Sequence, residues 1–68
     1  MIELKKKFGR SVKKLRTEKG ITQEELAGRA SISVDLLSLI ERGKSAPSFK
    51  TLEQIAIALE VEVKQLFE

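Results

Sequence analysis

Few side chains of this sequence could carry out chemistry. It contains neither cysteine nor histidine, so it lacks the residues that most often act as nucleophiles, general bases and transition-metal ligands. No glycine-rich loop is present to cradle a phosphate, the acidic residues are scattered, and the serines have no evident general base. We therefore expect no enzyme, no metal site and no cofactor.

The chemistry that remains is hydrogen bonding and charge, and the charge is unevenly distributed. Thirteen Lys and Arg residues against ten Asp and Glu give a net charge of +3. Residues 5–19 hold eight basic side chains and one acidic side chain, whereas residues 51–68 are net acidic. A basic end of this kind suits a polyanionic partner such as a nucleic acid.

The length of 68 residues predicts one small domain over residues 1–68. Below about 70–80 residues a single core rarely supplies more than a few kcal/mol, and without cysteine the remaining aids are helix packing and self-association. No apolar run predicts a secretion signal or a membrane span. We expect a cytoplasmic protein with no membrane partner, and no small-molecule ligand is evident.

Hydrophobic periodicity and helix-end signals predict an all-α fold. The expected elements are five helices, over residues 3–19, 22–30, 33–42, 48–59 and 63–67. The signals at their ends are a capping box from Thr22 to Glu25, cap residues Ser33 and Ser48, and terminating glycines Gly20 and Gly43. The fifth helix is poorly signalled because Glu62 is not a preferred cap.

Two of the expected helices carry an apolar stripe that should face the core. The stripe of the first consists of Leu4, Phe8, Val12 and Leu15. The stripe of the fourth consists of Phe49, Leu52, Ile55, Ala56 and Leu59.

The second and third helices are short and joined by a tight connection, which matches helix-turn-helix geometry. In such a pair the second helix enters the major groove of DNA. Placing residues 33–42 at 100° intervals directs Leu37 and Ile40 inward. The outward side chains are then Asp35, Ser38, Leu39 and Arg42, with Val34 to one side.

Residues 10–67 resemble the Cro and phage-repressor helix-turn-helix family, which includes xenobiotic-response-like regulators. The chain is most similar to its short members, such as restriction-modification controller proteins. The matching segments are Leu15-Arg16, Lys19 to Ala27, Ile32-Ser33, Ile40 to Lys44, Pro47-Ser48, Leu52, Ile55-Ala56, Ala58-Leu59 and Leu66-Phe67.

The resemblance implies a compact repressor-like domain that binds double-stranded DNA, with a palindromic operator, and regulates transcription as a homodimer. The DNA-binding residues that it implies are Gln23, Ser33, Val34, Asp35, Ser38, Leu39, Arg42, Lys44 and Ser45. Of these, Gln23, Arg42, Lys44 and Ser45 would contact phosphates. Arg16 and Glu41 match positions that form an internal ion pair in the family.

The third helix departs from the family pattern in its outward side chains. Relatives usually present side chains that form bidentate hydrogen bonds to bases, whereas Val34 and Leu39 can only pack against thymine methyl groups. One interpretation is DNA recognition through methyl contacts, DNA shape and backbone contacts. The alternative is that Val34, Leu36 and Leu39 form an apolar patch for a protein partner.

A dimer interface is predicted near the C-terminus, at Val63, Leu66 and Phe67. The alternative for these residues is closure of the monomer's own core, which we expect to take Leu66.

Overall fold

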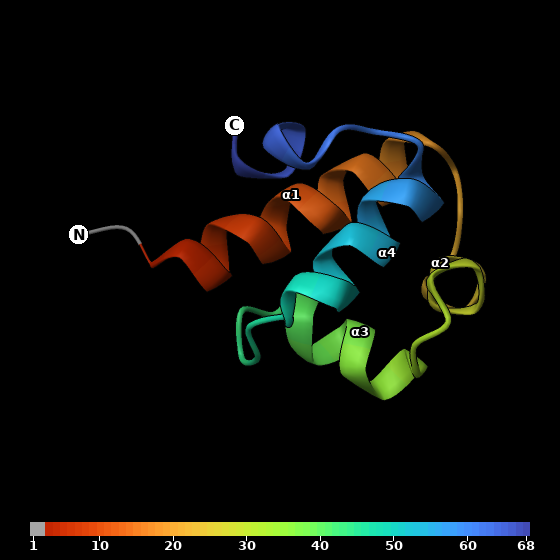
Figure 1. The fold of residues 1–68 in the computed structure, drawn as a ribbon. Coiled ribbons are helices and arrows are strands. Elements are labelled where there is room, and N and C mark those ends of the chain that lie inside the picture. The colour runs from red at the N-terminus through yellow and green to blue at the C-terminus, as the bar shows by residue number, and fades with distance from the viewer. Residues whose placement is uncertain (1–2) are drawn as a thin grey trace.

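The computed structural model describes residues 3–68, and its regular secondary structure in this range is helical (Figure 1). The α-helices are α1 (Leu4–Glu18), α2 (Gln23–Ala30), α3 (Val34–Glu41) and α4 (Phe49–Leu59). A short 3-10 helix, η1 (Val63–Phe67), follows them. Within residues 3–68 no helix has both the length and the apolarity that crossing a bilayer requires.

The fifth predicted helix is the one element whose type was wrong. Residues 63–67 form a 3-10 helix, so the part of the chain that the structure describes has four α-helices instead of five. At the start of this helix the Gln65 N–H donates to the Glu62 carbonyl, three residues earlier, at 3.0 Å. In return the Gln65 side chain accepts from the Glu62 N–H at 2.9 Å. Five residues give almost no room for the longer α-helical hydrogen bond, so the tighter form is favoured.

Side-chain caps at three helix starts explain why the predicted boundaries hold. Thr22 and Glu25 form the capping box of α2, with both hydrogen bonds between 2.9 and 3.0 Å. Ser33 accepts from the Leu36 N–H at 3.0 Å, and Ser48 accepts from the Thr51 N–H at 3.1 Å. These bonds satisfy backbone donors that a helix start otherwise leaves without a partner.

All four α-helices end in the same hydrogen-bonded turn, in which the chain reverses through a left-handed residue. Gly20 and Gly43 take this conformation after α1 and α3, as the sequence predicts. After α2 and α4 the left-handed residues are Ser31 and Glu60. Neither is a glycine, so the sequence does not mark these two positions.

The core lies where α1, α2, α3, α4 and η1 face one another. In Figure 1, α1 lies between η1 on one side and α3 on the other, and α4 packs across α2. The fully buried large side chains are Phe8, Val12, Leu26, Leu37, Ile40, Ile55, Leu59 and Leu66.

Two residues assigned to the apolar stripes are not in this core. Leu4 is 67% exposed and Phe49 is 87% exposed. Each stands at the first position of its helix, where no neighbouring element reaches far enough to cover it. Periodicity gives the direction of a side chain around the helix axis, but whether that side chain is buried depends on whether another element packs against it.

Gly9 sets how closely α1 approaches the end of α3. A methyl group at Gly9 would clash with the backbone carbonyl oxygen of Ile40 and lie 2.9 Å from that of Glu41. Only a residue without a side chain lets the two backbones meet at this distance. The close approach holds the C-terminal end of α3 firmly against α1.

Candidate nucleic-acid interface

The outer face of α3 is formed by the residues that the sequence places there. Val34 and Leu39 are each 38% exposed, and Asp35 is exposed as well. Ser38 is half-buried, while Leu37 and Ile40 on the opposite side are buried. The face therefore presents one carboxylate, one hydroxyl and two aliphatic side chains to the solvent.

Ser33 stands at the start of this face, and its hydroxyl is already engaged. It accepts the Leu36 N–H as the helix cap, although the hydroxyl hydrogen is still available for donation. Ser33 thus has a structural role besides the predicted DNA contact.

Arg16 and Glu41 lie side by side between α1 and the end of α3. The Arg16 Nε donates to Glu41 Oε2 at 2.7 Å, and Nη2 donates to Oε1 at 3.1 Å, which is a bidentate pair. A third donor, Nη1, reaches the Ile21 carbonyl at 2.9 Å, in the connection to α2. The Glu41 side chain is only 2% exposed and the Arg16 side chain 11%, so this largely buried ion pair ties three segments together.

Gln23 is held by the same carboxylate. Its side-chain Nε2 donates to Glu41 Oε1 at 2.9 Å, so the amide at the start of α2 is oriented by the end of α3. An amide nitrogen carries two hydrogens, and one of them is left for another acceptor. The sequence gives no signal for this bond, because it joins positions 18 residues apart through a packing arrangement.

Basic side chains gather where α3 ends. Arg42 and Lys44 are exposed, and Ser45 is half-buried in the same connection. Gly43 has a left-handed conformation, and the stem of Lys6 lies so close that a methyl group at Gly43 would be 2.7 Å from its Cγ. The first turn of α1 therefore packs beside this basic region through the Lys6 stem. Sequence reasoning missed this contact because it spans 37 positions.

Two exposed carboxylates, those of Glu25 and Glu3, are stabilised in their charged form. Hydrogen bonding by the Thr22 backbone N–H, then by its hydroxyl, lowers the pKa of Glu25 below its ordinary value. Hydrogen bonding and charge attraction from Lys6 lower the pKa of Glu3. The 3.1 Å pair of Lys6 with Glu3 is fully at the surface and contributes little to stability.

The predicted dimer residues lie at three different depths. Leu66 is completely buried in the chain's own core, as expected under the alternative of core closure, so its place among the predicted interface residues was wrong: burial leaves it no surface to offer another chain. Phe67 is half-buried, its ring centroid 5.3 Å from that of Phe8. Val63 remains accessible at 38% exposure.

The short helices α2 and α3 pack against each other and are joined by the tight connection of residues 31–33. Together with the basic region at the end of α3 and its exposed outer face, they define a helix-turn-helix protein. The chain belongs to the helix-turn-helix family HTH_3, whose model matches residues 12–66.

Named relatives agree with this membership. The HTH-type transcriptional regulator y4dJ of Sinorhizobium fredii is 40% identical over 65 residues, covering 96% of this chain and 84% of the relative. Control protein C.MunI of a Mycoplasma species is 37% identical over 68 residues, covering 98% and 92%. The immunity repressor of Bacillus phage phi105 is 40% identical over 58 residues, but the chain spans only 40% of its length.

The fold is also that of a solved controller protein. The restriction-modification controller C.AhdI of Aeromonas hydrophila superposes with a TM-score of 0.90 at 35% identity, covering 93% of this chain and 96% of that one. The relatives are thus transcriptional regulators and controller proteins, which points to a regulator family and away from enzymes.

Proposed function

We propose that this chain is a sequence-specific, DNA-binding transcriptional regulator that docks α3 in the major groove as a homodimer. The observation that carries the proposal is the exposed outer face of α3 with phosphate-binding candidates beside its C-terminal end. Gln23, at the start of α2, is hydrogen-bonded to Glu41 at that end. Arg42 and Lys44 come just after Glu41 in the chain. A helix lying in the major groove needs contacts of this kind to the phosphate backbone to fix its position.

Gln23 would contribute an oriented hydrogen-bond donor to a DNA phosphate. The bond to Glu41 fixes its amide, so its second N–H needs no reordering when a phosphate arrives. The adjacent N–H groups at the start of α2 favour an anion through the helix dipole. Arg16 neutralises Glu41, so the carboxylate that orients Gln23 does not repel the phosphate.

Lys44, Arg42 and Ser45 would also contact phosphates. Their contribution is mostly electrostatic, and each phosphate neutralised releases condensed counterions. These contacts fix the register of the protein on the duplex and do not read its sequence.

The base contacts would come from the outer face of α3. Val34 and Leu39 pack against thymine methyl groups, and Asp35 accepts a hydrogen bond from a cytosine amino group. Ser38, because a hydroxyl both donates and accepts, discriminates little. The expected operator is a palindrome that contains A·T pairs in each half-site.

Selection from random duplexes at about 50 mM salt tests this proposal, because electrostatic attraction is strong there. We expect enrichment of a two-fold symmetric site with thymines in each half. Repeating the selection with Leu39→Ala and with Asp35→Ala should change the preferred bases at particular positions. Failure to enrich any sequence, together with negligible duplex binding at this salt, would contradict the proposal.

The apolar character of α3 supports a second candidate, a helix-turn-helix used to bind protein. Val34 and Leu39, each 38% exposed, lie on the same outer face with half-buried Leu36 beside them. An exposed apolar face of this kind is a feature of protein interfaces. A partner whose binding is lost on Leu39→Asp, in a protein that shows no affinity for duplexes, would favour this function over DNA binding.

A further inference from the structure

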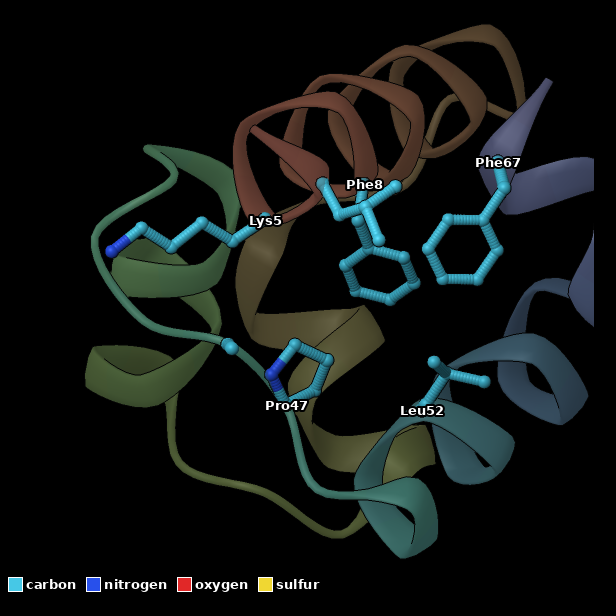
Figure 2. Close-up of a pocket in the computed structure, with 7 residues that line it drawn as sticks. Lys5, Phe8, Pro47, Leu52 and Phe67 are labelled. Atoms are coloured by element: carbon cyan, nitrogen blue, oxygen red, sulfur yellow. The ribbon is translucent and has the colours of Figure 1, made fainter. Parts of the chain in front are cut away.

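An apolar groove opens beside the start of α4, away from the outer face of α3. Figure 2 shows Phe8 and Phe67 side by side along it, with Pro47 and Leu52 at the opposite margin. The Lys5 side chain lies at the rim with its ammonium group turned away from the rings. The groove has a volume of about 170 Å³ and is lined almost wholly by apolar atoms.

Phe49 stands one helical turn before a lining residue of this groove and is almost fully exposed. It precedes Leu52, which lines the groove, by three residues on α4, and among residues 3–68 it is the most exposed large apolar side chain. A phenyl ring at 87% exposure gains nothing from the hydrophobic effect. One surface of the chain therefore carries an unfilled apolar groove and, next to it, an uncovered aromatic ring.

We propose that a second copy of this chain covers this surface, with Phe49 of each copy seated in the groove of the other. If a two-fold axis lies between the projecting ring and the groove, the ring of each copy enters the groove of the other. This is the self-complementarity that a symmetric dimer needs. The sizes agree, because a cavity of about 150 Å³ lined by apolar side chains takes up a benzene molecule. The groove holds about 170 Å³.

Charge supports the same occupant. Glu53 and Ile57 follow Phe49 at intervals of four residues, so the three share the exposed side of α4, where Ile57 is 76% exposed. Lys5 marks the rim of the groove at the basic end of α1. Among the ion pairs within residues 3–68 neither Lys5 nor Glu53 takes part. Seating Phe49 in the partner's groove brings the Glu53 side of one copy toward the Lys5 rim of the other.

This inference rests on the homodimer of the proposed function and gives it a particular interface. The centre of contact moves from Val63 to Phe49, and Phe67 remains part of it as the wall of the groove. None of the residues proposed to contact DNA lines this surface, so dimer formation and DNA binding do not compete for the same side chains.

Sedimentation equilibrium on the full chain tests the interface. Wild-type protein should dimerise reversibly, and Phe49→Ala should weaken the dimer about 100-fold, because a central aromatic contact is worth roughly 10-fold or more and symmetry removes it twice. Phe49 is exposed in the single chain, so the variant should keep the far-UV spectrum of the folded protein. Leu39→Ala is the control: it truncates another exposed apolar side chain, on α3 away from the groove, and should leave self-association unchanged.

Charge reversal supplies an independent measurement. Lys5→Glu and Glu53→Lys should each weaken the dimer several-fold, and the double variant Lys5→Glu/Glu53→Lys should recover most of the loss. A wild type that stays monomeric to about 1 mM would overturn the proposal, as would a Phe49→Ala variant that dimerises like the wild type. If the chain dimerises through Phe49 but binds no duplex, the DNA-binding function fails while this interface stands.

Discussion

Substituting alanine for glycine at two helical positions should have opposite effects. Gly9 lies in α1 against the carbonyl oxygens of Ile40 and Glu41, where a methyl group has no room. Gly28 lies in α2, where no atom outside its own helix comes within 4 Å of the added methyl group. Both residues are inside helices, so the backbone conformation itself permits alanine at either position.

The magnitudes follow from two competing terms. Alanine is favoured over glycine inside a helix by about 0.5–1 kcal/mol, and this gain applies at both positions. At Gly9 it is opposed by overpacking against backbone atoms, which cannot rotate away, at a cost of about 3 kcal/mol. We expect Gly9→Ala to lower the free energy of unfolding by about 2 kcal/mol, and Gly28→Ala to raise it by about 1 kcal/mol.

Thermal unfolding followed by far-UV circular dichroism measures both effects. For a domain of this size 1 kcal/mol corresponds to about 4–8 °C, so Gly9→Ala should lower the midpoint by about 8–16 °C and Gly28→Ala should raise it by about 4–8 °C. Protein concentration must be equal in all samples, because dimerisation stabilises the folded state by mass action. Two changes of the same sign would refute the close approach of α1 and α3 as the controlling feature.

Further substitutions test the phosphate contacts, the buried ion pair and the capping box. Lys44→Ala should weaken binding to all duplexes about equally and reduce the slope of log K against log salt by about 1, so a loss confined to one sequence would contradict its role. Arg16→Met should cost about 3–5 kcal/mol in urea unfolding because Glu41 is left charged and buried, whereas a variant in which both residues are replaced by apolar ones should recover much of the loss. The pKa of Glu25 is lowered in the folded state, so its contribution to stability is present above its ordinary value of 4.5 and disappears as pH falls through the lowered pKa. The difference in thermal midpoint between wild type and Glu25→Ala should therefore shrink from pH 7 to pH 3, and a constant difference would exclude the carboxylate as its source.

Local signals in the sequence were sufficient for most of the fold. Capping residues, terminating glycines and a 3.6-residue apolar period act over a few positions, so they placed α1 to α4 within a residue or two of their observed ends. The same signals gave the outward direction of Asp35 and Leu39, because a helix fixes its side-chain directions once its inward residues are known. The 3-10 form of η1 was missed because five residues carry too little periodicity to separate the two helix types.

The sequence by itself determined which segments are helical, which faces are apolar and that the second and third helices form a helix-turn-helix, since each of these depends on neighbours along the chain. Only the tertiary structure decided that Glu41 orients Gln23, that Lys6 lies beside Gly43, and that Gly9 is needed for the contact of α1 with α3. Only the tertiary structure shows that Leu66 is buried in the core and that Phe49 is exposed near a groove. These features depend on the distance between packed helices and on how far along each helix the contact extends. The spacing of residues along the chain does not specify either of these.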